Sequence, residues 1–267
     1  MLSPSFSATP AIAAAVLAAL LAWLMVRAIR KDRREYGRFK RYRSTTRRQA
    51  LYRKWVFESF MVFGGSALVV TVLVWQHIPL FFDDFAALPA VVEFGHLVND
   101  TGGLIPGFAI GATVTLIVGS IIGIYLARHS EEVPAIGDIA ALLPRNRAEL
   151  RYGWLLSINA GVVEELLFRL AFPVLIFAAT GSAAVAVAGS VALFGLLHIY
   201  QGLWGVIGSL VIGTLLMAVF LSTGSILLAV ALHALIDLRS LVLIPVVVYR
   251  VHRVTGAAGR TPAPATR

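Results

Sequence analysis

Six ionisable side chains lie in three stretches of sequence that are otherwise apolar. They are Glu164, Glu165 and Arg169 in the first stretch, His198 in the second, and His233 and Asp237 in the third. An ionisable group in hydrocarbon costs at least a few kcal/mol, so each of these residues requires a partner or a function. Carboxylates and imidazoles are also common proton carriers in hydrolytic reactions. These residues are therefore the candidate functional site.

The spacing of these residues predicts two pairs and one carboxylate that is less fully paired. Glu165 and Arg169 are four residues apart, which places them on one helix face where they can form an ion pair. Glu164 is rotated by about 100° from Glu165, because an α-helix has 3.6 residues per turn, so Arg169 need not neutralise it. His233 and Asp237 are also four residues apart and should point into the same side of a helical bundle.

Two kinds of chemistry fit this set. A buried Glu164 could act as a general base toward water, with one histidine assisting and the other stabilising an oxyanion. Alternatively, Glu164, His198 and His233 could be the three ligands of a catalytic zinc ion with one open position. The sequence lacks a His-Glu-x-x-His zinc signature and a Gly-x-Ser-x-Gly nucleophile elbow. No cofactor is therefore required by the motifs, and a divalent metal such as zinc stays open.

The composition indicates a membrane protein. The chain has 267 residues, of which 58% are hydrophobic and 14% are charged, and its mean hydropathy is +0.83. Soluble domains carry about a quarter charged residues, so an ordinary water-soluble globule is excluded. The chain has no cysteine, which excludes disulfide scaffolds, Cys-ligated metal sites and thiol catalysis.

The apolar segments predict an all-α fold, a polytopic transmembrane helical bundle with about seven spans. A helix needs about 20 apolar residues to cross a bilayer core. The candidate spans are 11–29, 55–75, 104–127, 153–178, 183–200, 204–222 and 225–248. The three motifs fall on the fourth, fifth and seventh spans.

Positive charge is concentrated between the first two spans. Thirteen of the 23 Lys and Arg residues lie between Arg27 and Lys54. The positive-inside rule explains this run as a cytoplasmic loop, so membrane lipids rather than nucleic acid are the expected partner. The acidic 76–103 loop suits the outer side, with a short interfacial helix expected around Phe85–His96. We therefore expect a cell membrane protein with its N-terminus outside and its C-terminus in the cytoplasm, and the Ala- and Arg-rich composition points to a bacterial source.

The chain divides into three parts. Residues 1–103 hold two spans with the basic and acidic loops, and residues 104–250 hold the three motifs. Residues 251–267 are rich in Ala, Pro, Gly and Arg and are predicted to form a disordered cytoplasmic tail. Pairs of small residues four apart, such as Ser209 and Gly213, should let helices approach closely.

The three motifs together resemble the CPBP family of intramembrane proteases, which comprises type II CAAX prenyl endopeptidases and the bacteriocin-processing Abi group. The residues that carry the resemblance are Glu164-Glu165-x-x-x-Arg169, Phe194-x-x-x-His198 and His233-x-x-x-Asp237. The resemblance covers about residues 104–248. It implies an endopeptidase in which Glu165 and Arg169 support the site.

The resemblance also implies roles for the other motif residues. Glu164 would activate water with help from His198, and His233 and Asp237 would lie on the oxyanion side. An ionised Asp cannot donate a hydrogen bond, so Asp237 would be protonated or would orient His233. The substrate would be a membrane-associated or lipid-anchored protein or peptide.

Two other classes of function fit parts of the same pattern. Intramembrane Glu, His and Asp residues also mark proton pathways, which is the pattern of a proton-coupled transporter. A non-catalytic immunity or scaffold membrane protein could retain the motifs without hydrolysis. The effect of Glu164→Gln on activity separates these alternatives from a protease.

Overall fold

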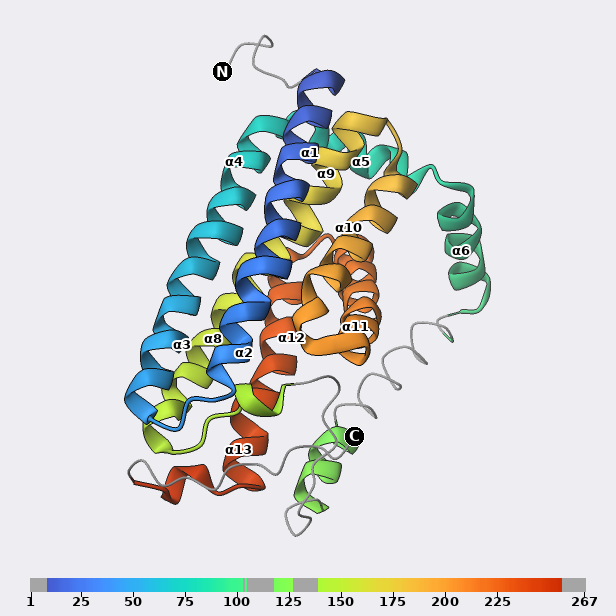
Figure 1. Ribbon diagram of the computed structural model, residues 1–267. Helices are drawn as coiled ribbons and strands as arrows, with labels where there is room; N and C mark the ends of the chain where they lie inside the picture. Colours follow the sequence, from blue (N-terminus) through green and yellow to red (C-terminus); the bar gives the residue numbers. More distant parts are fainter. Residues whose placement is uncertain (1–8, 103, 105–117, 127–138, 256–267) are drawn as a thin grey trace.

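The computed structural model describes residues 9–102, 104, 118–126 and 139–255 (Figure 1). Every regular element in these ranges is a helix, and no strand occurs in them. The prediction of an all-α fold is therefore confirmed. Most of the long helices run along a common direction, as expected for a membrane-spanning bundle.

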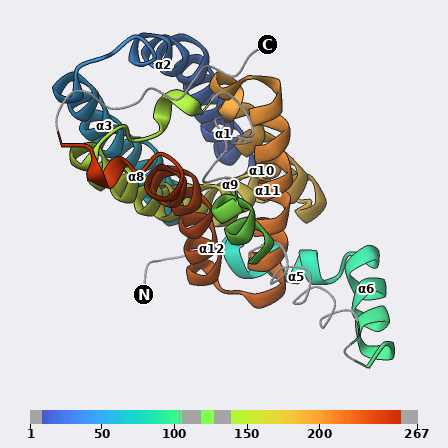
Figure 2. The same cartoon turned by 90° about the horizontal axis from the view of Figure 1, so that it is seen from below.

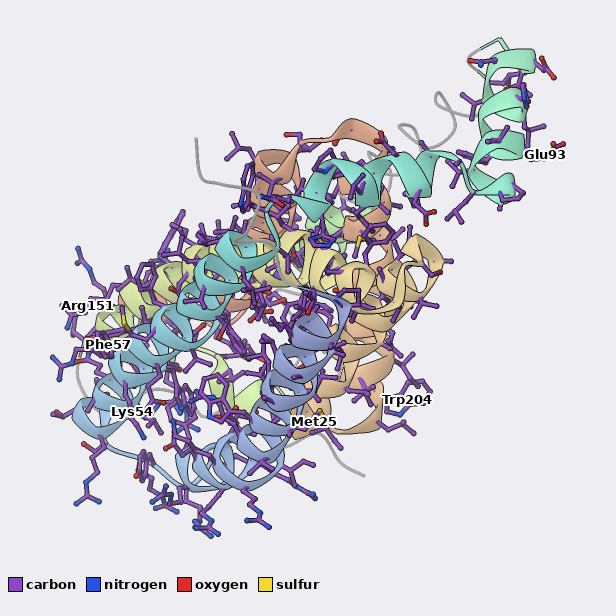
Figure 3. All side chains as sticks on the ribbon, turned by 90° about the horizontal axis from the view of Figure 1, so that it is seen from above. Met25, Lys54, Phe57, Glu93, Arg151 and Trp204 are labelled. Atoms are coloured by element: carbon purple, nitrogen blue, oxygen red, sulfur yellow. The ribbon has the colours of Figure 1, made fainter. Side chains whose placement is uncertain are left out.

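The N-terminal part forms two long helical rods and a short pair of helices. The first rod consists of α1 (Pro10–Val26), the π-helical turn η2 (Arg27–Asp32) and α2 (Arg33–Phe39). The second rod consists of α3 (Thr45–Ser59), the π-helical turn η3 (Phe60–Gly64) and α4 (Gly65–Val74). The short pair is α5 (His77–Ala86) and α6 (Pro89–Asp100). A helix is thus present near the expected range 85–96, and α6, which carries Glu93, extends away from the bundle (Figure 3).

The C-terminal part carries the motifs. One helical run is α8 (Arg147–Glu165), the π-helical turn η6 (Leu166–Ala171) and α9 (Phe172–Thr180). The next is α10 (Ala183–Leu197), the 3-10 turn η7 (His198–Gln201) and α11 (Gly202–Thr223). The last is α12 (Ile226–Leu238), the π-helical turn η8 (Arg239–Leu243) and α13 (Ile244–Val247). Two short 3-10 turns, η5 (Ala140–Leu142) and η9 (Val251–Arg253), flank this part.

Within the described residues, four helical stretches are long and apolar enough to cross a membrane: Pro10–Phe39, Thr45–Val74, Ala183–Thr223 and Ile226–Val247. The third stretch is divided at Gly202, whose φ of 79° and ψ of −176° break the helix, and α10 and α11 pack against each other. This break separates the predicted spans 183–200 and 204–222. The predicted span 153–178 lies within the run from α8 to α9, whereas 104–127 falls mostly outside the described residues. The count of seven spans therefore stays a prediction.

The run from α8 to α9 lies at the centre of the described part. α3 and α12 pack against α8, while α1, α4 and α10 pack against α9 (Figures 1 and 2). The largest buried cluster accordingly joins Ala13 of α1, Val70 of α4, Leu175 of α9 and Ala186 of α10. The helix that carries the first motif is therefore enclosed by both N-terminal rods and by the other motif-bearing helices.

Close packing of α8 on α12 depends on two glycines. A Cβ atom at Gly161 would lie 3.0 Å from the Cβ and backbone nitrogen of Ala234 in α12. A Cβ atom at Gly153 would lie 2.5 Å from the carbonyl oxygen of Leu241. Side chains at either position would hold the helices apart. The glycines thus permit the approach that brings the first and third motifs together.

The basic segment between Arg27 and Lys54 is mostly helical. Residues 40–44 are the only interruption between α2 and α3, and nitrogen-tipped side chains crowd this end of the two rods (Figure 3). Many of these cations, such as Arg33, Arg38 and Arg47, are exposed. Others form ion pairs that join the rods, including Lys54 with Glu35.

Arg48 departs from this pattern because it is completely buried. Its Nε donates to Oε2 of the equally buried Glu149 at 3.0 Å. Its Nη2 donates to the Tyr52 hydroxyl at 2.8 Å and to the carbonyl oxygens of Ala141 and Leu143, both at 3.0 Å. Arg48 therefore ties α3 to the chain that enters α8. The positive-inside rule, which covers the segment as a whole, does not account for this residue.

The start of the C-terminal tail is folded. Val251 of η9 is buried, and the backbone N–H of Arg147 donates to the carbonyl oxygen of Val254 at 3.2 Å. The first residues of the segment expected to be disordered thus pack against the beginning of α8. Residues 256–267 lie outside the described residues.

Candidate active site

Glu165 and Arg169 form a buried ion pair where α8 passes into η6. Nε of Arg169 lies 2.9 Å from Oε2 of Glu165, and Nη2 donates to Oε1 at 3.2 Å. Neither side chain has exposed surface. The pair expected from the four-residue spacing is therefore present. Its second member lies in a π-helical turn, a local distortion that often accompanies functional sites.

His233 of α12 completes the environment of Glu165. Its Nδ1–H donates to Glu165 Oε1 at 2.7 Å, across the close contact between α8 and α12. The other ring nitrogen, Nε2, lies 3.8 Å from Oδ2 of Asp237, one helical turn further along α12. The imidazole is thus held between two carboxylates. The Asp237 side chain is 32% exposed, so this end of the arrangement is the more open one.

Glu164 has a different environment from its neighbour Glu165. Its Oε2 atom is buried and has no hydrogen-bond partner among the described residues. The carboxylate interacts electrostatically with His233, Glu165 and Arg169, none of which donates a hydrogen bond to Oε2. Oε2 of Glu165 also lacks a hydrogen bond, but it lies 2.9 Å from the Nε of Arg169, and Oε1 is bonded by Arg169 and His233. The two adjacent glutamates are therefore distinguished by their charged partners, because Glu165 is in an ion pair and Oε2 of Glu164 has no partner among the described residues.

His198 lies at the end of α10 and has a defined tautomer. Its Nδ1 lies 2.7 Å from the carbonyl oxygen of Phe194, which can only accept, so Nδ1 carries the proton. In the neutral ring Nε2 is then the acceptor. The residue is only partly buried. Its free nitrogen can therefore meet a water molecule or a substrate.

The ring of Phe194 connects the three motifs. Its centroid lies 4.8 Å from that of His198 and 5.9 Å from that of His233. The guanidinium carbon of Arg169 lies 4.8 Å from the same centroid. In the sequence, the four-residue spacing from His198 is the feature that indicates that Phe194 lies beside this histidine. Side chains from η6, η7 and α12 therefore all contact the ring of Phe194.

The described positions of the side chains give no support to the zinc alternative. The described residues contain no group of three or more His, Cys, Asp or Glu side chains placed to hold a metal ion. Glu164, His198 and His233 are not among such groups, and the choice between metal-dependent and glutamate-dependent chemistry stays a prediction.

A comparison with protein families was made for the whole chain. Residues 146–239 match the family model described as Type II CAAX prenyl endopeptidase Rce1-like. This match supports the CPBP family of CAAX proteases for this part of the chain. This CAAX protease segment begins at Asn146, the residue that caps α8 through its side chain, and ends directly after α12. No curated protein and no solved structure matched the chain.

The family assignment agrees with the resemblance stated from the motifs, because all six candidate residues lie within the CAAX protease segment. A family of this kind suggests a protease that acts on a membrane-associated protein. The two N-terminal rods lie outside the matched segment, although they pack directly on it. The contacts of these rods with the matched segment, such as that of Arg48 with Glu149, cannot be predicted from the three motifs.

Proposed function

We propose that the chain is an intramembrane endopeptidase that hydrolyses a peptide bond of a membrane-associated or lipid-anchored protein by direct attack of water. The family match over residues 146–239 supports peptide hydrolysis. The absence of cysteine and of a serine nucleophile elbow supports direct attack rather than an acyl-enzyme. The four apolar helices support a position within a membrane.

The single observation that carries the proposal is the unequal pairing of two adjacent carboxylates. Glu165 is bonded by Arg169 and by His233, so its charge is already compensated. Oε2 of Glu164 is buried and has no hydrogen-bond partner in the described part of the chain. A carboxylate oxygen in that condition can accept a proton from water. Glu164 is therefore the general base of the proposed reaction, with Glu165 and Arg169 supporting it.

His198 is the assisting residue. Because its Nδ1–H is bonded to Phe194, its Nε2 lone pair can accept a hydrogen bond from the attacking water and orient it. The same nitrogen can carry a proton to the departing amine when the peptide bond breaks. The contact with Phe194 holds the imidazole of His198 close to the residues of the other two motifs.

His233 and Asp237 form the oxyanion side. A lone pair on Nε2 facing an ionised carboxylate would be repulsive, so a proton lies on one of these two groups. Whichever group carries it, the pair can present a donor to the oxygen of the substrate carbonyl. Such donors stabilise the charge that develops in the transition state. The bond from Glu165 to Nδ1 fixes the imidazole in this orientation.

The reaction then follows in two steps. The water oxygen bonds to the carbonyl carbon, the water proton passes to Glu164, and the electron pair of the C=O double bond moves to the oxygen. The tetrahedral intermediate then collapses, the C–N bond breaks, and the amine takes the proton held by Glu164, either directly or through Nε2 of His198. The substrate segment must unfold locally to expose its carbonyl, because a helix uses that group in its own hydrogen bonds.

The proposed setting is a bacterial cell membrane, with about seven spans, the N-terminus outside and the C-terminus in the cytoplasm. Exposed cations around α2 and the start of α3 support a cytoplasmic position for this end of the bundle. The protease core is assigned to residues 104–250, with lipids as the surrounding partner and no role for nucleic acid.

The test compares purified wild type with Glu164→Gln on a library of quenched fluorescent peptides in proteoliposomes, with and without a chelator. Glu93→Gln is the control, because it makes the same change on α6, away from the bundle. We expect Glu164→Gln alone to abolish cleavage and the chelator to have no effect. Cleavage by Glu164→Gln at the wild-type rate would overturn the proposal. Flux driven by a pH gradient would favour the transporter, and a cellular phenotype that survives Glu164→Gln at equal abundance would favour the non-catalytic scaffold.

A further inference from the structure

A tyrosine that the mechanism above does not use lies directly against His198. Tyr200 belongs to the same turn, η7, and follows the histidine by two residues. Its ring is stacked on the imidazole, with 6.0 Å between the ring centroids and 28° between the planes. The ring of Tyr36, from α2, packs edge-on against Tyr200 at 5.6 Å and 75°. Tyr200 is thus held by contacts with the second motif and with the first N-terminal rod.

The hydroxyl group of Tyr200 is oriented but keeps its proton. Nε2 of Gln201 donates to the hydroxyl oxygen at 2.9 Å, so this oxygen acts as an acceptor. No described residue accepts the phenolic proton in return. The position of Gln201 depends on a glycine one turn later, since a Cβ atom at Gly205 would lie 2.3 Å from Cβ of Gln201. The turn therefore presents a donor that is fixed in place and unused.

This donor is in the electrostatic environment of the acidic residues of the site, beside the ring of His198. The Tyr200 hydroxyl interacts electrostatically with Glu164 of the first motif and Asp237 of the third, and also with Asp32 of η2. It is therefore within the region where the first, second and third motifs meet. A phenol in its ordinary protonation state can donate a hydrogen bond, whereas an ionised Asp237 can only accept one.

We propose that Tyr200 is a further catalytic residue, which donates a hydrogen bond to the substrate carbonyl oxygen as this becomes an oxyanion. The inference rests on the proposed function, because it adds a donor to the same hydrolytic step. In that step the water oxygen bonds to the carbonyl carbon, the water proton passes to Glu164, and the electron pair of the C=O bond moves to the oxygen. Tyr200 keeps its proton throughout and shares it with the new negative charge. Tyrosine hydroxyls are among the side-chain donors that serve such oxyanion holes.

The test uses four variants of the full chain in proteoliposomes, with the peptide that wild type cleaves fastest. Tyr200→Phe removes the hydroxyl and keeps the ring that stacks on His198. Tyr42→Phe is the matched control, because it removes the same group from a ring that packs against Phe39 in the aromatic cluster of α2 and α3. Glu164→Gln reports on the proposed function itself. Monodispersity and Tm are measured for each protein.

We expect Tyr200→Phe to lower kcat by about 10²–10³-fold with little change in KM, since loss of one oxyanion donor has an effect of this size. Tyr42→Phe should behave as wild type. A kcat for Tyr200→Phe within about threefold of wild type, with Glu164→Gln inactive, would overturn the role of Tyr200 and leave the proposed function standing. Full cleavage by Glu164→Gln would overturn both. Gln201→Leu, which retains the hydroxyl but frees it, should lower kcat by about five- to tenfold even where Tyr200→Phe folds poorly.

Discussion

A single methyl group added to α11 should impair the site from a helix that carries no motif. Gly213 is buried in α11, and a Cβ atom there would lie 2.8 Å from Cδ1 of Phe194. Carbon atoms in favourable contact are about 3.5–4.0 Å apart, so Gly213→Ala requires the Phe194 ring to move by about 1 Å. The sequence predicted only that a small residue here would help helices to pack.

The movement should reach the reacting groups because of what rests on that ring. Phe194 contacts His198, His233 and the guanidinium of Arg169. A displacement of about 1 Å in a catalytic arrangement can lower the rate by about 10²-fold. Overpacking of a buried site costs about 1–3 kcal/mol of stability. We therefore expect Gly213→Ala to lower kcat by about 10²-fold and to lower Tm by a few degrees.

The assay measures kcat, KM and Tm for Gly213→Ala beside Gly65→Ala. A Cβ atom at Gly65, in α4, meets no described atom within 4 Å, so this control should be neutral or slightly stabilising. In the double variant Gly213→Ala, Phe194→Leu, the shorter side chain should restore Tm, while kcat stays low because the aromatic contact with His198 is lost. Wild-type kcat and Tm for Gly213→Ala would refute the coupling through Phe194.

Three further outcomes follow from the buried charges and from the donor set. Arg48→Met leaves the buried carboxylate of Glu149 without its partner and should lower the free energy of unfolding by about 3–5 kcal/mol. The control Arg47→Ala, at an exposed position, should change it by less than about 0.5 kcal/mol. Equal Tm values for the two variants would contradict this prediction. Glu165→Gln should lower Tm because Arg169 loses its counter-charge, while Glu164→Gln should keep Tm and lose cleavage; the reverse order would exchange their roles. Dialysis against a chelator should leave the cleavage rate unchanged, and a loss restored by added zinc would require a ligand set other than the described one.

The parts of the site that lie on one helix could be predicted from the sequence. The pairs Glu165 with Arg169 and His233 with Asp237 follow from a four-residue spacing, which depends only on helix geometry. The helical class follows from the length and hydropathy of the apolar segments. These features are local, so no knowledge of the tertiary arrangement is needed.

The contacts between helices could not be predicted in the same way. The bond from His233 to Glu165 joins residues 68 positions apart and depends on the close approach that Gly161 permits. Arg48 is one of thirteen cations in its segment, and its burial depends on Glu149, which lies 101 positions further along the chain. Charge counting treats the members of such a run alike. Only the packing of α3 on α8 singles one of them out.

The division of labour between Glu164 and Glu165 shows how such packing assigns chemistry. The two residues are identical in type and adjacent in sequence, so spacing alone predicts only that they point in different directions. Glu165 points toward α12 and η6, where Arg169 and His233 bond to it, and this compensation makes it a structural anion. Glu164 keeps a buried oxygen that has neither a hydrogen bond nor an ion pair among the described residues. A water molecule placed beside a peptide carbonyl would donate a hydrogen bond to that oxygen. The missing hydrogen bond is unfavourable in the resting protein, but it leaves Glu164 available to accept a proton from the water.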